Sequence, residues 1–197
     1  SHSKLLDKYS VNLIVVGIGS HKSKEFFCNF NNLDKKNVFT VNNADLHNKL
    51  NLNNGLFFPI PAILNLLLMC TGLNSKGTIK EVFRGYFGDI KANRIFSSEE
   101  NIKIGPLSLL KGKMFEVFSK KNVLRPFELA TRRLINMIEI LGNWNVYVPD
   151  SSFLTQRGAT ILINEKDQVL YEFISESLLG YSSNMSSPLS FLDDFLK

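Results

Sequence analysis

The 197-residue chain has few of the residues that build metal centres and disulfide frameworks. It contains two cysteines and three histidines, and they lack the CxxC or Cys/His spacing of a zinc site. Two cysteines are also too few for the disulfide scaffold of a small secreted domain, so we expect a reducing compartment. The sequence therefore predicts neither a metal ion nor another cofactor.

The chain also lacks a long hydrophobic run and a concentration of charge of one sign. Its most apolar stretch, residues 56–70, is too short to span a bilayer, and Pro59, Pro61 and Asn65 interrupt it. The net charge is a modest +5 and the basic pairs are scattered along the chain, which disfavours nucleic acid as a partner. No signal or transit peptide is visible either. These absences favour an ordinary globular domain.

What the sequence does contain suits one domain over residues 1–197. The hydrophobic fraction of 44% and the charged fraction of 21% are typical of globular proteins, and the chain is long enough to bury a core. Short strand patterns alternate with helical patterns, which is the order of an α/β domain. Residues from about 52 to 150 are expected to form a large, mainly helical insertion.

The clearest strand signal is a β-hairpin near the end of the chain. Residues 159–163 are apolar and β-branched, residues 164–168 form a polar turn, and residues 169–174 alternate with a period of two. Arg157 and Gly158 stand at the start of the first strand, where an arginine can point out of the sheet end and a glycine lets another backbone come close. Arg157 is therefore predicted to hold an anion.

The first part of the chain predicts a strand over residues 11–16 and a helix over residues 22–31. Gly17 and Gly19 between them suggest a dinucleotide-binding loop, but Lys22 stands where the third glycine would be, and no ribose-binding acid follows at a suitable place. Cys28 lies within the predicted helix, away from the N-terminal dipole that would activate a thiol, so packing is the favoured role.

The insertion begins with the apolar stretch that ends at Cys70. A buried core helix over about residues 61–71 is favoured, and the alternative is a docking surface for a membrane or a large partner. A helix over residues 78–87, a long irregular connection over residues 93–121 and an amphipathic helix that Pro126 opens and Gly142 ends are predicted to follow. A last helix is predicted over residues 188–196.

Five segments of the chain resemble the peroxiredoxin-like AhpC/TSA antioxidant proteins, and in particular their cyanobacterial and plastid branch. They are residues 11–20, 77–82, 125–131, 147–149 and 155–175. The resemblance implies a thioredoxin-like sheet and a thiol peroxidase or related oxidoreductase that takes electrons from a thiol reductant. It also implies that Arg157 lies beside the peroxide-reducing cysteine and stabilises its thiolate.

The family's active-site cysteine motif and the central strand before it are not found, so the first βα unit is expected to be missing or incomplete. Cys28 and Cys70 fall on no family active-site position and are secondary candidates, and no disulfide is expected between them. Catalysis would then need an N-terminal cysteine motif outside this sequence. The alternative is a non-catalytic accessory or structural subunit of a larger thylakoid-associated assembly, contacted through residues 56–124.

The expected location follows from the same resemblance and from composition. The many Asn, Lys, Phe and Ile residues indicate an AT-rich coding sequence, which is typical of a plastid, a reduced nucleus or a parasite genome. We therefore expect a plastid protein, in the stroma or associated with thylakoids, and otherwise a cytoplasmic one.

Overall fold

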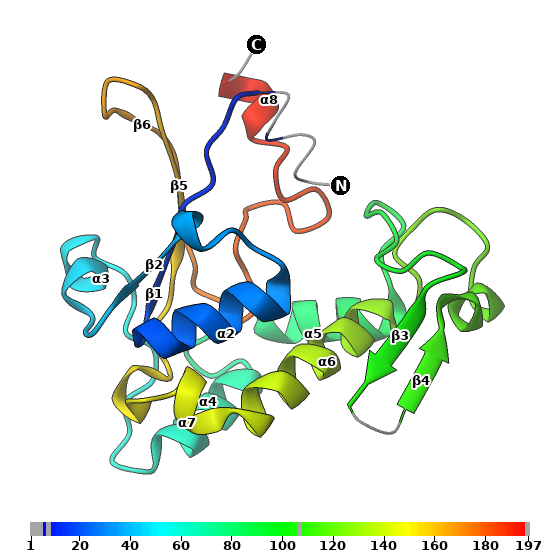
Figure 1. Ribbon diagram of the computed structural model, residues 1–197, viewed down its shortest axis with the longest axis horizontal. Coiled ribbons are helices and arrows are strands. Elements are labelled where there is room, and N and C mark those ends of the chain that lie inside the picture. The colour runs from blue at the N-terminus through cyan, green and yellow to red at the C-terminus, as the bar shows by residue number, and fades with distance from the viewer. Residues whose placement is uncertain (1–5, 7–8, 106–107, 196–197) are drawn as a thin grey trace.

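The computed structural model describes residues 6, 9–105 and 108–195. The helices and strands are β1 (Val15–Ile18), α2 (His21–Asn31), β2 (Val38–Val41), α3 (Asp45–Lys49), α4 (Ala62–Cys70), α5 (Thr78–Phe87), β3 (Asn101–Ile104), β4 (Ser108–Lys111), α6 (Glu128–Gly142), α7 (Trp144–Tyr147), β5 (Ala159–Ile163), β6 (Val169–Ile174) and α8 (Leu192–Phe195). Short 3₁₀ helices lie at Lys35–Asn37, Gly112–Val117 and Ser151–Phe153. The predicted mixture of helices and strands is confirmed (Figure 1).

The strands of the described residues form separate pairs rather than one continuous sheet. β1 pairs with β2 in parallel, whereas β5 and β6 form the predicted antiparallel hairpin with a bulge after Leu162. β1 and β5 each have a single hydrogen-bonded neighbour among the described strands, so each leaves one backbone edge unpaired. The α/β class is confirmed. The predicted thioredoxin-like sheet is divided between the β1–β2 pair and the β5–β6 pair.

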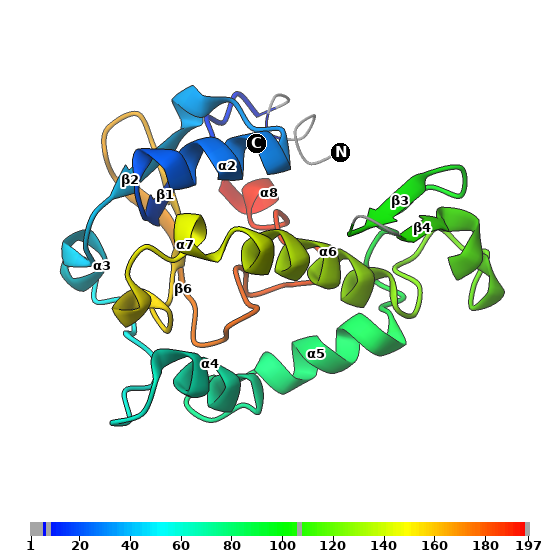
Figure 2. The same cartoon turned by 60° about the horizontal axis from the view of Figure 1, so that its bottom comes forward.

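Helix α2 connects the two parallel strands and has clear end signals. Ser20 and Ser23 form a reciprocal capping box at its start, and Asn32 ends it in the left-handed conformation. The Ser23 hydroxyl also donates a hydrogen bond of 2.6 Å to the carbonyl oxygen of Val146 in α7. This contact fixes α2 over the end of the insertion (Figure 2).

The insertion holds α4 to α7 and also a hairpin that the sequence did not indicate. Residues 93–121 were predicted to be an irregular connection, and this prediction is wrong, because β3 and β4 pair there. Asn101–Ile104 alternates polar and apolar residues, but a strand of four residues is too short to stand out from the polar stretch around it. Burial of Ile102 against Phe96 and Phe115 in a small core cluster supplies what the local pattern lacks.

A buried ion pair stands beside this small core. Arg125 and Glu128 are both inaccessible to solvent and join through Nη2 and Oε1 at 2.6 Å. The carboxylate also accepts hydrogen bonds from the backbone N–H groups of Arg125 and Phe96, at 2.8 and 3.3 Å. Glu128 is the first residue of α6, so the pair anchors the amphipathic helix predicted from Pro126 to Gly142.

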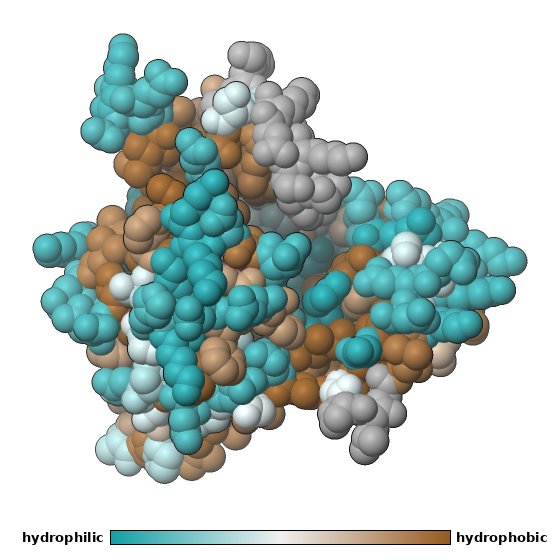
Figure 3. All heavy atoms as spheres, in the orientation of Figure 1, coloured by the Kyte–Doolittle hydropathy of each residue, from teal (hydrophilic) through white to brown (hydrophobic). Residues whose placement is uncertain are grey.

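Helix α4 lies where it was predicted, but it is not the buried core helix that was favoured. Its outer side chains Ile63, Leu64 and Leu67 are exposed, and only Asn65 and Met69 are buried. Other apolar side chains reach the surface over α5 and α6, where Figure 3 shows them in brown. None of the described helices is long and apolar enough to cross a membrane.

Both ends of the chain differ from the sequence prediction. The first strand begins at Val15 rather than at residue 11, and the helical turns predicted at residues 4–9 lie largely outside the described residues. The last helix begins at Leu192 rather than at residue 188 and is described as far as Phe195, and Phe191 just before it stacks on Tyr171 of β6 at a centroid distance of 4.1 Å. The final segment is thus held against the hairpin.

Candidate functional site

Arg157, the residue singled out from the sequence, is buried just before β5. Its side chain is 4% exposed, and its Nε donates a hydrogen bond of 2.8 Å to the carbonyl oxygen of Thr155. Nη2 donates to the same oxygen and lies 3.8 Å from the sulfur of Met69 in α4. Among the described residues, Nη1 of Arg157 makes no hydrogen bond.

The charge of Arg157 has no carboxylate to balance it within the described part of the chain. Burial disfavours a charged guanidinium and lowers the pKa of Arg157 to about 10, so the group still carries its charge at neutral pH. A buried cation without a counter-ion is costly, and an incoming anion would offset that cost. The geometry therefore suits an anion-binding role.

A loop of residues 53–55 holds the backbone around Arg157. The N–H of Arg157 donates a hydrogen bond of 2.8 Å to the carbonyl oxygen of Asn53, and the Thr155 hydroxyl donates one of 3.0 Å to that of Asn54. Gly55 has φ +83°, and a Cβ there would lie 2.2 Å from the carbonyl oxygen of Thr155. Only glycine allows this close approach.

The glycine next to Arg157 has a different role from the one predicted. Gly158 was expected to let another backbone come close, but a Cβ added there would meet no atom within 4 Å. That prediction is wrong, and Gly55, which lies far from Arg157 in the sequence, provides the close approach instead. Sequence reasoning missed it because glycines in polar loops are common and their contacts are not local.

The thiol of Cys70 lies at the end of α4, close enough for the charge of Arg157 to affect it. Burial raises the pKa of the Cys70 thiol, and the positive charge of Arg157 opposes this effect. The C-terminal end of a helix also disfavours a thiolate, since the dipole is negative there. Arg157 is thus the group that favours ionisation of Cys70, and the residue itself is exposed.

Cys28 has a different environment, and the two cysteines are not bonded. It is buried within α2, and both cysteines are free thiols, as predicted. Within the described ranges no three His, Cys, Asp or Glu side chains come together to hold a metal ion. His47 is only partly exposed, and burial lowers the pKa of its ring.

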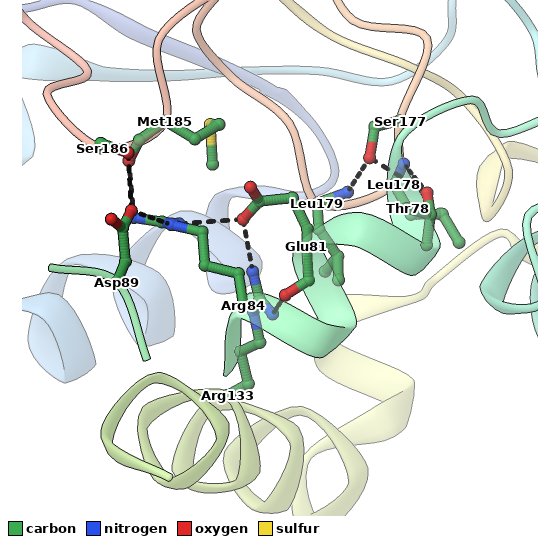
Figure 4. Close-up of polar contacts among 10 residues, drawn as sticks. All are labelled: Thr78, Glu81, Arg84, Asp89, Arg133, Ser177, Leu178, Leu179, Met185 and Ser186. Atoms are coloured by element: carbon green, nitrogen blue, oxygen red, sulfur yellow. Dashed lines mark hydrogen bonds and ion pairs between the residues drawn. The ribbon is translucent and has the colours of Figure 1, made fainter. Parts of the chain in front are cut away.

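A second polar cluster joins α5 to the final segment of the chain (Figure 4). Arg84 binds Glu81 at 2.9 Å and Asp89 at 2.8 Å, and it donates a hydrogen bond of 2.7 Å to the carbonyl oxygen of Met185. Arg133 of α6 approaches the same Glu81 carboxylate at 3.1 Å. Part of this cluster has a local sequence signal, because Glu81 and Arg84 are spaced to pair on one helix face.

The Arg84 cluster holds structure rather than a ligand, because its charges are already paired with one another. Ser186 donates a hydrogen bond of 2.6 Å to Asp89, and the N–H of Leu178 is bound by the hydroxyls of Ser75 and Thr78. A cleft of about 760 Å³ lies beside this cluster, between α5 and residues 173–186, and neither Arg157 nor Cys70 lines it. The unbalanced charge is at Arg157, and the candidate site is therefore placed there.

The structure brings together two residues that the sequence named separately, Arg157 and Cys70, and leaves Cys28 in another part of the domain. Sequence reasoning missed Met69, Thr155 and Asn53, which shape the site. They carry no recognisable motif, and their contribution depends on contacts between distant segments.

Comparison with known proteins agrees with the α/β architecture. The family model of the AhpC/TSA antioxidant enzymes matches residues 1–177, which is most of the chain. No curated protein and no solved structure matches the sequence. The chain is a peroxiredoxin-like, thioredoxin-fold protein and belongs to the AhpC/TSA antioxidant enzyme family.

Proposed function

We propose that this protein has a thiol-dependent antioxidant role and reduces a peroxide at the Arg157 site, with a thiol reductant as electron donor. The observation that carries the proposal is the buried guanidinium of Arg157, which has no carboxylate partner in the described chain and acts on the thiol of Cys70. A cation next to a thiol is the pairing that peroxide reduction needs, because both the nucleophile and the leaving group are anions.

The atoms and electrons of the proposed reaction balance with a peroxide and a thiol reductant as the other reactants. The Cys70 thiolate attacks one oxygen of the peroxide, the O–O bond breaks, and the sulfur becomes a sulfenic acid while the other oxygen leaves as an alkoxide or hydroxide that takes up a proton. The Nη1 group of Arg157 is the donor proposed to stabilise that oxygen. Two thiols of the reductant then return Cys70 to its reduced state and become a disulfide, with release of water.

Peroxide consumption with a thiol reductant tests this proposal. Wild type is expected to consume peroxide, Cys70→Ser to abolish the activity, and Arg157→Met to lower kcat/KM by about 100-fold or more, as the loss of a donor to a developing anion does. Cys28→Ser is the matched control and is expected to keep wild-type activity. Activity that survives in Cys70→Ser but falls in Arg157→Met would overturn the assignment of Cys70 and leave Arg157 serving another thiol.

The second candidate is a non-catalytic accessory or structural subunit of a larger plastid assembly, associated with thylakoids and bound through residues 56–124. The exposed apolar side chains of α4 and α5 favour it, since large exposed apolar patches commonly mark interaction sites. The raised pKa of Cys70 also favours it, because a thiol is less reactive than a thiolate. Wild-type protein that consumes no peroxide would support this candidate over the enzyme.

A further inference from the structure

The outer face of α4 carries apolar side chains that nothing in the described chain covers. Ile63, Leu64 and Leu67 lie on one side of the helix and are exposed, with Leu67 at 54%. Asn65 and Met69 lie on the opposite side and are buried. The helix therefore has an outer apolar face and an inner face that reaches the Arg157 site.

Two phenylalanines before the helix extend this apolar face. Phe57 is 64% exposed and Phe58 is also exposed. The buried side chain of Asn65 holds them in place, since its Oδ1 accepts a hydrogen bond of 3.1 Å from the N–H of Phe58 and its Nδ2 donates one of 3.1 Å to the carbonyl oxygen of Phe58. The backbone that carries these exposed aromatic side chains is thus held to α4 at Phe58.

The chain segment that carries this surface has charge of one sign. Residues 46–80 contain no aspartate or glutamate, although the chain's average of 18 acids in 197 residues would place about three in such a stretch. They contain three lysines, Lys49, Lys76 and Lys80. In Figure 2, α4 and the segment before it form the outermost layer below α7. An apolar face at the periphery, in a segment that has lysines but no acids, is complementary to a surface that is apolar and negatively charged.

We propose that Phe57, Phe58, Ile60, Ile63, Leu64 and Leu67 form a docking surface for the interface of an anionic lipid bilayer. The aromatic and aliphatic side chains enter the boundary between headgroups and acyl chains, while the lysines contact the headgroups. A second copy of the chain fits less well, because both copies of this segment carry the same positive charge. The inference does not rest on the peroxide chemistry.

Co-sedimentation with lipid vesicles tests the proposal. Wild type is expected to bind vesicles of phosphatidylcholine with phosphatidylglycerol, to bind pure phosphatidylcholine weakly, and to dissociate at about 0.5 M salt, where charge attraction is screened. Leu67→Glu and Phe57→Glu are each expected to weaken binding by about tenfold or more, since each removes one large inserted side chain.

Val117→Glu provides the matched control. Val117 is 85% exposed and lies in the 3₁₀ helix after β4, so the substitution adds the same charge at a site outside the proposed surface, and it is expected to leave binding unchanged. Far-UV circular dichroism of each variant establishes that it is folded. Equal loss of binding in Val117→Glu, or a wild type that binds neither vesicle, would overturn the proposal. Stable dimers in light scattering that Leu67→Glu dissociates would also overturn it, in favour of a second copy.

Discussion

Two buried arginines in this protein have opposite electrostatic surroundings. Arg125 is paired with Glu128 at 2.6 Å and also donates a hydrogen bond to the carbonyl oxygen of Phe96, so its charge is neutralised inside the domain. Within the described residues, the guanidinium of Arg157 contacts only the carbonyl oxygen of Thr155 and the sulfur of Met69. A buried charge is costly unless a partner compensates it. We therefore infer that Arg125 has a structural role and that Arg157 has a binding role.

The first prediction concerns the titration of Cys70. Its rate of alkylation by iodoacetamide should reach half its maximum at a higher pH than an unperturbed cysteine does, because burial raises the pKa of the thiol. Arg157→Met should move this midpoint higher still, because it removes the charge that favours the thiolate. Arg94→Met, at an exposed arginine, is the control. A midpoint that Arg157→Met leaves in place would contradict the electrostatic coupling.

The second prediction concerns the buried ion pair. Glu128→Ala should lower the free energy of unfolding by about 3–5 kcal/mol, because Arg125 is left buried and unpaired. The double variant Arg125→Met/Glu128→Leu should recover much of that loss, since no uncompensated charge remains. Glu25→Ala, which breaks the exposed pair with Lys35, should have little effect. Chemical denaturation measures the free energy of unfolding of all three variants. Equal decreases in Glu128→Ala and Glu25→Ala would contradict the conclusion that the Arg125–Glu128 pair is buried.

The roles of individual residues could be predicted from the sequence only where those roles depend on neighbouring positions in the chain. Arg157 stood out because it precedes a clear hairpin, and Cys70 because thiols are rare in this chain. Their proximity could not be predicted, because Arg157 and the Met69 next to Cys70 are separated by 88 positions. The role of Gly55 was hidden for the same reason, whereas Gly158 looked more important than it is.

At the scale of elements, α5 connects the insertion to the last segment of the chain. Arg84 is the centre of this connection, because it binds two carboxylates of its own region and the carbonyl oxygen of Met185. Arg133 brings α6 into the same cluster through Glu81. The segment after β6 is therefore held by side-chain contacts rather than by strand pairing.

The third prediction tests this attachment. Arg84→Met should increase amide hydrogen exchange in residues 181–190 by about tenfold or more, because the charged hydrogen bond to Met185 and the position of Asp89 are both lost. Lys80→Met, at an exposed position of the same helix, should leave the exchange rates of this segment unchanged. Unaltered exchange in Arg84→Met would show that other contacts hold the segment.

Helices were easier to predict from the sequence than strands or burial. α5 begins and ends at the predicted residues, because a glycine precedes and follows a helical run. β3 and β4 were missed, since the period-two alternation of Asn101–Ile104 covers only four residues and does not stand out among polar and glycine residues. The exposure of α4 was also missed, because composition alone does not tell whether a neighbouring element covers an apolar helix.

At the scale of the whole molecule, the described strands form three separate pairs with unpaired edges. β1 and β5 each present an unpaired edge within the described residues, and apolar side chains near them, including Ile14 and Ile163, are exposed. Such edges are usually paired or covered in stable domains. The family could be predicted from the sequence, because the segments that resemble it are spread along the chain. The division of the sheet could not, because it depends on how distant strands pair in the folded structure.

The most direct test of the redox assignment is the detection of a sulfenic acid on Cys70. The protein is treated with a stoichiometric amount of hydrogen peroxide in the presence of dimedone, and the modified cysteine is identified by mass spectrometry. The account predicts an adduct on Cys70 in wild type, none on the buried Cys28, and formation slower by about tenfold or more in Arg157→Met. An unmodified Cys70, or an adduct that forms at the same rate without Arg157, would contradict it.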